Sequence, residues 1–545
     1  MSVVPSSSLD GEMDSTKMTK EQTREDSFIS SDVGHSSSAI RKKEGLSLPL
    51  IFSALSVTVG GSLLAGFNTA VLSVPSSEMK EFFNESYRHR MGSHLDPEQE
   101  RWLWSITVST LCIGAAIGAL LSSYPSNRFG RKKTIMMNNA FSISGAMLMS
   151  LSVISHSYEM VVIGRFLVGI NLGVVTAVVP IYLTEISPTN LRGLVTALHG
   201  MLQNLGVSLS QALGLYVFTW ASSWPLLIGP PVIMTSLFQL TTGLCSPESP
   251  RWLYIKRNQQ QTAIKALRRL RTSNDISCDI SDMDEERVRE KTQEVVGILD
   301  LLRLRQPGWG RPLLLTIICN CCVHLTGVNA IWFYLIEVFH ATGLSERQIG
   351  FVTVWLGIAN VFVTLLSGYC FDRFGRRPMI IGSLAVCIIN LSTLTACMQF
   401  QTYYSWLPWV SASLIAVHTL MVSLGPGAAP FVLCTEIWSQ GPRSSAMAFG
   451  SQVYWTMNFL VGLLFPTLQA YLGPYCFLLF AGILTLIFVY FWFELPETRN
   501  KTFEEIACNF KKDVTFQNKD EIKRLYENQD LSIAKAQCHH EEKHV

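Results

Sequence analysis

The chain has 545 residues, 48% of them hydrophobic, and 56 of its 84 charged residues lie in residues 1–46, 246–311 and 496–545. The rest of the chain is therefore rich in apolar side chains and poor in charge, which favours a membrane protein over one soluble domain. A formal net charge of +2 without a basic stripe excludes nucleic acid as an expected partner.

Twelve apolar runs are long enough to cross the hydrocarbon layer, which takes about 20 residues per helix. Backbone groups in lipid must bond within their own segment, so we expect each run to be a helix in contact with membrane lipid. The predicted spans are residues 46–75, 101–124, 134–154, 160–186, 191–217, 224–245, 312–338, 347–370, 377–397, 407–437, 444–470 and 473–495. The predicted fold class is an all-α membrane protein with twelve transmembrane helices.

The loops on the side of the N-terminus carry most of the Lys and Arg of the short loops, as in residues 128–133 and 373–377. Cytosolic loops are enriched in these residues, so we predict that both termini are cytosolic. Residues 1–44 are Ser-rich and charged, which predicts a disordered tail and not a secretion signal. The first outer loop holds the sequon Asn84-Glu85-Ser86, so Asn84 is a predicted glycosylation site.

Three motifs recur at a separation of about 250 residues and indicate a duplication. Arg128-Phe-Gly-Arg returns as Arg373-Phe-Gly-Arg, and the pair Glu185 and Arg192 returns as Glu436 and Arg443. A Pro-Glu motif closes each half, at Pro247 and Pro496. Duplicated halves typically hold a binding site between them near the midplane. The predicted organisation is a disordered cytosolic tail (1–45), a six-helix bundle (46–245), a partly helical cytosolic linker (246–311), a second six-helix bundle (312–495) and a cytosolic tail (496–545).

Charges of both signs stand at the predicted cytosolic helix ends and suit a reversible gate, in which ion pairs between the halves form when the inner side closes. The alternative is that basic residues only anchor helix ends, but acidic residues such as Glu185 are not needed for orientation. Arg165 lies within a span, and we expect it to brace the inner-end network and not the solute. The candidate gate residues are Arg128, Arg131, Arg165, Glu185, Arg192, Arg251, Asp372, Arg376, Arg377, Glu436 and Arg443.

Polar side chains at mid-span depth are candidates for solute contact, although each could instead hydrogen-bond a neighbouring helix. Together they predict a wet cavity for a neutral polyhydroxy solute. His324 and Asn329 are about 140° apart on a continuous helix, and we expect Gly327 to unwind the span so that both turn inward. The candidates from this reasoning are Asn68, Gln203, Gln211, His324, Asn329, Asn360 and Asn458.

Two patterns typical of enzymes are rejected. His540-Glu-Glu-Lys-His544 matches a metalloprotease motif but lies in a polar tail with no core around it. The chain has no Gly-Lys dipeptide and hence no Walker A loop, so we expect no ATP hydrolysis by this chain. We predict that the protein is not an enzyme and has neither a metal site nor a cofactor.

These motifs together resemble the sugar porters of the major facilitator superfamily, in particular the animal facilitative hexose transporters, from about residue 50 to residue 507. The resemblance rests further on Pro180-Ile-Tyr-Leu-Thr-Glu185, Thr326-Gly-Val-Asn-Ala330 and Gly425-Pro-Gly427. It implies alternating access by two six-helix bundles in the plasma membrane, with a monosaccharide bound between them.

Departures from the family pattern bear on the solute and on energy coupling. The resemblance places Phe431 in the site, where glucose carriers have tryptophan, and Tyr454 where they have asparagine. Proton-coupled relatives carry an acid in the first span where this chain has Asn68, so the resemblance implies uniport. The remaining alternatives are a non-transporting sugar sensor or receptor, and a carrier of another solute such as urate or a polyol.

Overall fold

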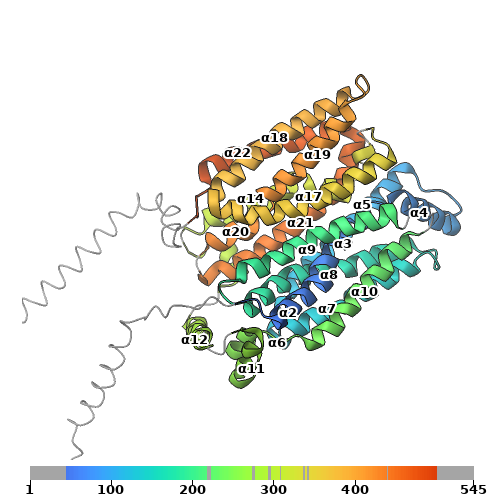
Figure 1. Ribbon diagram of the computed structural model, residues 1–545. Coiled ribbons are helices and arrows are strands. Elements are labelled where there is room, and N and C mark those ends of the chain that lie inside the picture. The colour runs from blue at the N-terminus through green and yellow to red at the C-terminus, as the bar shows by residue number, and fades with distance from the viewer. Residues whose placement is uncertain are drawn as a thin grey trace, which may run out of the picture. The chain divides into compact units, whose positions relative to one another are not determined.

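Apolar runs of the sequence form twelve long helical segments within the described part of the chain, and each falls on one of the predicted spans (Figure 1). Those of the first half are α2–η1–α3 (Leu48–Val57, Thr58–Leu63 and Leu64–Ala70), α5 (Pro97–Leu121), α7 (Arg131–Leu151), α8 (Tyr158–Ile186), α9 (Arg192–Tyr216) and α10 (Trp224–Cys245). Those of the second half are α14–α15 (Gly310–Leu325 and Val328–Phe333), α17 (Glu346–Phe374), α18 (Arg376–Phe400), α19–α20 (Leu407–Leu424 and Ala429–Glu436), α21 (Gln440–Leu472) and α22 (Tyr475–Glu494).

This computed structural model describes residues 45–217, 223–272, 276–292, 296–306, 308–334, 338–340, 343–438 and 440–499. Both predicted tails lie outside these residues, apart from residues 45 and 496–499.

Shorter helices lie between the spans. They are α4 (Ser76–Met91), α6 (Ser123–Phe129), η2 (Trp252–Lys256), α11 (Gln260–Leu270), α12 (Ser277–Thr292) and α13 (Ile298–Leu302).

Nine helical segments in the described ranges are both long and apolar enough to cross a membrane. The three remaining spans, α7, α9 and α21, are more polar, and their contacts explain why. The helices α9 and α21 face the other half of the chain, because α9 packs against α17 and α21 against α5. Helix α7 exchanges amide hydrogen bonds with α8, in which Asn138 Nδ2 donates to Asn171 O at 3.0 Å and Asn171 Nδ2 donates to Asn138 O at 3.1 Å.

Small residues let α5 and α8 pack closely, as their glycine spacing predicts. A Cβ atom on Gly114 would lie 2.2 Å from the carbonyl oxygen of Phe166, and one on Gly173 would lie 2.0 Å from that of Ala115.

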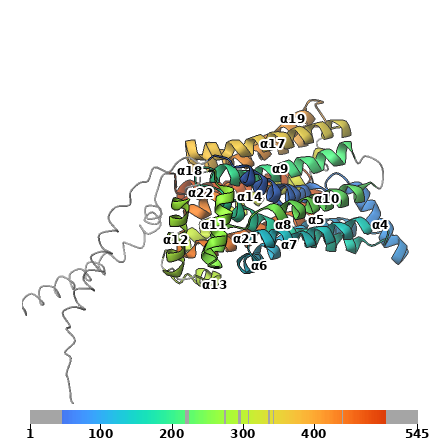
Figure 2. The ribbon, with the colours of Figure 1, turned by 60° about the horizontal axis from the view of Figure 1, so that its bottom comes forward.

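Figures 1 and 2 show α4 at one end of the long helices and α11 and α12 at the opposite end. The linker helices therefore lie beside the helix ends that carry the candidate gate charges.

Two spans are broken, and both breaks bear on the candidate site. Gly327 takes a left-handed conformation (φ 79°) and separates α14 from α15, as the unwinding expected there requires. The span α19–α20 is interrupted at Gly425-Pro-Gly427. Proline and glycine both disfavour a continuous helix at that point.

Candidate functional site

The break between α14 and α15 brings two predicted site residues together. Asn329 Nδ2 lies 2.8 Å from His324 Nδ1 and also donates to Asn458 Oδ1 of α21 at 2.8 Å. The His324 ring is fully buried and lies edge-on to Tyr454, with ring centroids 4.2 Å apart. Because Asn329 Nδ2 is the donor, His324 Nδ1 accepts and the proton of the neutral ring is on Nε2, which has no hydrogen-bond partner among the described residues.

A second polar cluster joins the two halves. Asn204 of α9 donates through Nδ2 to Thr364 Oγ1 of α17 at 2.8 Å and accepts from Asn360 Nδ2 at 3.2 Å. Ser423 of α19 donates to Asn360 Oδ1 at 2.6 Å. Neither Asn204 nor Thr364 is among the residues predicted from the sequence. The available signal was helical spacing, because Asn204, Ser208 and Gln211 lie on one face of α9.

The hydrogen bonds of Asn68 and Gln211, two candidates of the first half, go to other groups than these clusters. The Gln211 side chain is fully buried and donates to Ala70 O and Ser73 Oγ, so it joins α9 to the end of α3. Asn68 donates to Leu64 O of its own helix, and its Oδ1 is buried without a partner in the described part of the chain. Gln203 is half-buried, and its backbone packs against Gly66.

The prediction that Arg165 braces the inner-end network is wrong. The Arg165 side chain is fully buried and donates to two backbone carbonyls, Asn68 O at 2.6 Å and Val108 O at 3.5 Å. It therefore joins α8 to α3 and α5. Arg165 and Glu185 stand near opposite ends of α8, about 30 Å apart at 1.5 Å per residue, so one cluster cannot hold both.

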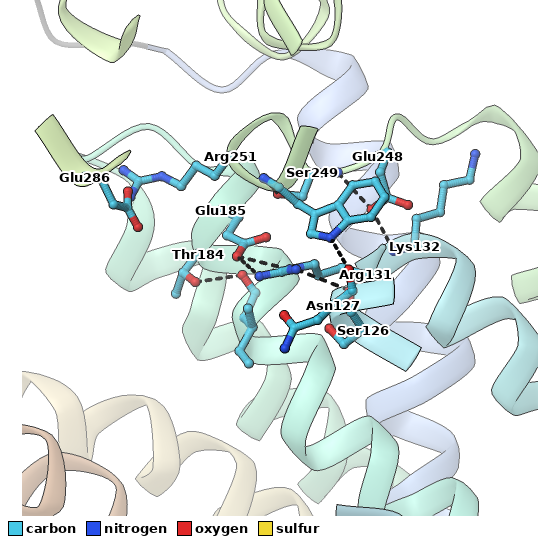
Figure 3. A network of polar contacts seen from close by, with 12 residues as sticks. Ser126, Asn127, Arg131, Lys132, Thr184, Glu185, Glu248, Ser249, Arg251 and Glu286 are labelled. Carbon is cyan, nitrogen blue, oxygen red and sulfur yellow. Dashed lines mark hydrogen bonds and ion pairs between the residues drawn. The ribbon is translucent and has the colours of Figure 1, made fainter. Parts of the chain in front are cut away.

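At the other end of α8, Glu185 pairs with the first residue of α7 (Figure 3). Arg131 Nη2 lies 3.0 Å from Glu185 Oε1, and Arg131 Nη1 donates to Ser126 O at 3.3 Å. The Glu248 carboxylate accepts from the backbone amide of Lys132 at 2.9 Å. An anionic side chain thus satisfies a free amide in the first turn of α7, where the helix dipole also favours negative charge.

The second half repeats this arrangement at the start of α18. Arg376 Nη2 lies 3.0 Å from Glu436 Oε1, and Arg376 Nη1 donates to Phe371 O at 3.2 Å. The Glu497 carboxylate accepts from the backbone amides of Arg376 and Arg377 at 3.0 and 3.1 Å. We name these two clusters the helix-end clamps, with Arg131, Glu185 and Glu248 in the first and Arg376, Glu436 and Glu497 in the second.

Glu248 and Glu497 were not among the predicted gate residues. Each follows the proline that closes its half, and each approaches the glycine that directly precedes the clamped helix. Gly130 and Gly375 have φ values of 102° and 96°, and a Cβ atom on either would lie 2.5 or 2.6 Å from the facing carboxylate oxygen. The repeated Gly and Pro-Glu motifs are visible in the sequence, but only the fold shows that the glutamate of one lies beside the glycine of the other.

The clamps differ from the predicted gate in one respect. The pairs Arg131–Glu185 and Arg376–Glu436 each join helices of the same half, whereas the prediction placed such pairs between the halves. The reason is that the end of α8 lies beside the start of its neighbour α7, and α20 is related to α18 in the same way.

The other predicted gate residues lie around the clamps. Arg251 pairs with Glu286 of α12, and Arg443 donates to the carbonyl oxygen of Trp438. Arg192 is half-buried, and the Arg128 side chain is exposed. The side chains of Asp372 and Phe431 lie outside the described residues.

The predicted glycosylation site has an internal structural role. Asn84 Nδ2 donates to Glu100 Oε2 at 2.6 Å, and Asn84 Oδ1 accepts from the backbone amide of Leu95 at 3.2 Å. These bonds connect α4 to the start of α5. A glycan on Asn84 Nδ2 would replace one of the two hydrogens with which this nitrogen can donate to Glu100.

The linker contacts helices of both halves. Arg271 donates to the carbonyl oxygen of Ile186 at the end of α8 and pairs with Asp279 of α12. Ser445 of α21 donates to Val296 O at 2.5 Å. Within the linker, the hydrogen bond to Asp284 raises the pKa of the Tyr254 hydroxyl.

The helical spans, their polar contacts between halves and the repeated helix-end clamps define a transmembrane transporter of the major facilitator class. The family model described as sugar (and other) transporter matches residues 53–510. The chain belongs to this sugar transporter family.

Human relatives and bacterial structures agree with this assignment. Facilitated glucose transporter member 5 of solute carrier family 2 is 36% identical over 489 residues, which cover 89% of this chain and 97% of the relative. Member 9 of the same family is 35% identical over 475 residues, 87% of each chain. The fold is similar to the inward open xylose transporter XylE from E. coli, with a TM-score of 0.69 and 21% identity over 84% of this chain and 99% of that one.

Proposed function

We propose that this protein is a facilitative uniporter, which moves a hexose or a similar neutral polyhydroxy solute by alternating access. The observation that carries the proposal is the chemistry of the side chains gathered by the broken spans. His324, Asn329, Asn360, Asn458 and Ser423 are all uncharged groups that donate and accept hydrogen bonds. Sugar hydroxyls offer the same capacities, and no charge needs to be neutralised.

The environment of Asn68 supports uniport. Arg165 bonds to the backbone carbonyl of Asn68, and the side chain of Asn68 is an amide that does not titrate in the physiological range. This point of the first bundle therefore offers no carboxylate that could carry a proton along with the solute. The names of the relatives, facilitated glucose transporters, agree with this mode.

The helix-end clamps supply the rigid units that alternation requires. Each clamp fixes the starting turn of one helix to the end of another in the same half, so these ends move together. Contacts between the halves include neutral hydrogen bonds, such as Asn204 to Thr364. Such bonds exchange with water at modest net cost, which suits an interface that opens and closes.

The identity of the solute is tested by measuring which unlabelled compounds inhibit the entry of one radiolabelled hexose. Purified protein in liposomes is given radiolabelled D-glucose or D-fructose, and unlabelled hexoses, polyols and urate are added in turn. The proposal predicts saturable hexose entry that other hexoses inhibit. Binding without entry would favour the sensor alternative, and inhibition by urate or polyols alone would exclude a hexose as the solute.

We also propose that the carrier lies in the plasma membrane. Surface labelling of cells tests this location.

A further inference from the structure

We propose that His418 is a positioning residue, which holds the α14–α15 break in the shape that brings His324 and Asn329 together. His418 lies in α19 and is fully buried. Its Nε2 lies 3.0 Å from the carbonyl oxygen of Thr326, the residue that precedes Gly327. The inference rests on the proposed function, because the site that His418 orders is the proposed solute site.

The hydrogen-bond chemistry assigns the roles of the two ring nitrogens. A carbonyl oxygen can only accept, so His418 Nε2 carries the proton and donates. Carbonyl groups in the last turn of a helix lack intrahelical partners, and a buried carbonyl without a partner is costly. His418 therefore supplies from α19 a donor that the broken span needs at Thr326.

The position of this bond links it to the site. Thr326 lies two residues after His324 and three before Asn329, and those two side chains meet at 2.8 Å only because the chain turns between them. The turn is also stabilised locally, since Gly327 N donates to His324 O at 2.9 Å and Val328 N to Thr326 Oγ1 at 3.3 Å. The bond from His418 fixes this turn to another span.

The same helix reaches the second polar cluster. Ser423 lies five residues after His418 in α19 and donates to Asn360 Oδ1 of α17. A movement of α19 would thus displace the turn at Thr326 and the contact at Asn360 together. His418 couples the two broken spans that border the candidate site.

Three variants separate this role from simple packing. His418→Phe keeps an aromatic ring but removes the donor. In His418→Gln the side-chain nitrogen can take the place of the ring Nε2, whereas the shorter amide of His418→Asn takes the place of Nδ1 and cannot reach Thr326 O. Entry of radiolabelled D-fructose and D-glucose into liposomes is measured per folded carrier for each variant. We expect KM to rise about fivefold or more in the Phe and Asn variants. In the Gln variant KM should stay within about twofold of the wild-type value, and kcat should change less than KM in all three.

A second measurement does not depend on transport. Amide hydrogen exchange of residues 327–333 in the purified protein should be faster in the Phe and Asn variants than in the wild type and the Gln variant. Equal KM values and equal exchange in all four proteins would overturn the inference. If no hexose enters with any of them, the proposed function fails, and hydrogen exchange alone decides whether His418 holds the break.

Discussion

Asn68 and Arg165 meet inside the first bundle through a backbone carbonyl and not through an ion pair. Asn68 Oδ1 and Arg165 Nε are both buried without a hydrogen-bond partner among the residues that the structure describes. Asn68→Asp would put a carboxylate where this guanidinium can bind it, and that carboxylate could gain and lose a proton. We expect transport by this variant to depend on pH, whereas wild type and Asn68→Ser give flat profiles. Hexose flux between about pH 5.5 and pH 7.5 measures the difference, and a flat profile for the Asp variant would argue against proton control at this position.

Asn329 connects its span to α21 and to His324 at once. Asn329→Ala removes both hydrogen bonds and leaves His324 Nδ1 without its partner, at a cost of about 1–3 kcal/mol in solute binding. We expect KM to rise with little change in kcat. Asn390→Ala is the matched control, because Asn390 donates to Leu414 O, which precedes the break at Gly425 by eleven residues. An equal rise of KM in both variants would mean that Asn329 acts only through packing.

The sequence identified polar residues within the spans but not the groups that each of them contacts. His324, Asn329 and Asn458 were chosen as polar residues in apolar spans, and the structure brings them together. Gln211 met the same criterion but bonds the end of α3. The pattern cannot distinguish the two cases, because an amide that faces a neighbouring helix and one that faces a solute have the same spacing along the chain.

A glycine directly precedes each clamped helix, and a substitution there tests whether the close approach of the carboxylate stabilises the helix start. Gly375 combines a φ of 96° with a carboxylate oxygen 2.6 Å from the position of a Cβ atom. We expect Gly375→Ala to lower the free energy of unfolding by about 1–3 kcal/mol and to slow turnover, because Glu497 must move from the amides that it caps.

The matched control is a glycine within α18, the helix that Gly375 precedes. A Cβ atom on Gly382 of α18 would have no atom of the described residues within 4 Å, so Gly382→Ala should be neutral or stabilising. Thermal unfolding of the purified variants in detergent gives the comparison. Equal melting temperatures for the two variants would show that the clamp tolerates a side chain at Gly375.

Most of the helices were predictable because a run of sufficient hydrophobic length can span lipid. Helix caps were predicted less well. The caps on α7 and α18 come from Glu248 and Glu497, which lie 116 and 121 residues away along the chain. Local sequence rules cannot identify such partners, and they also miss the donor that His418 provides to the α14–α15 break.

Across the whole molecule, α9 and α17 form a close contact between the halves. A Cβ atom on Gly357 would lie 2.8 Å from Ser208 Cβ, within reach of a disulfide after a small adjustment. We expect the double variant Ser208→Cys with Gly357→Cys to form a crosslink under oxidation and to stop transport. Reduction should restore the flux, and each single variant serves as a control. Full transport by the crosslinked protein would mean that this contact does not open.

As a uniporter, the protein is expected to equilibrate a neutral sugar across the membrane without concentrating it. The most direct measurement is the entry of radiolabelled hexose into liposomes that contain the purified protein, with an imposed pH gradient and then with a protonophore. We predict that the internal concentration rises to the external value and stops there, and that the protonophore changes neither the rate nor the end point. Accumulation above the external concentration that collapses on adding the protonophore would contradict uniport.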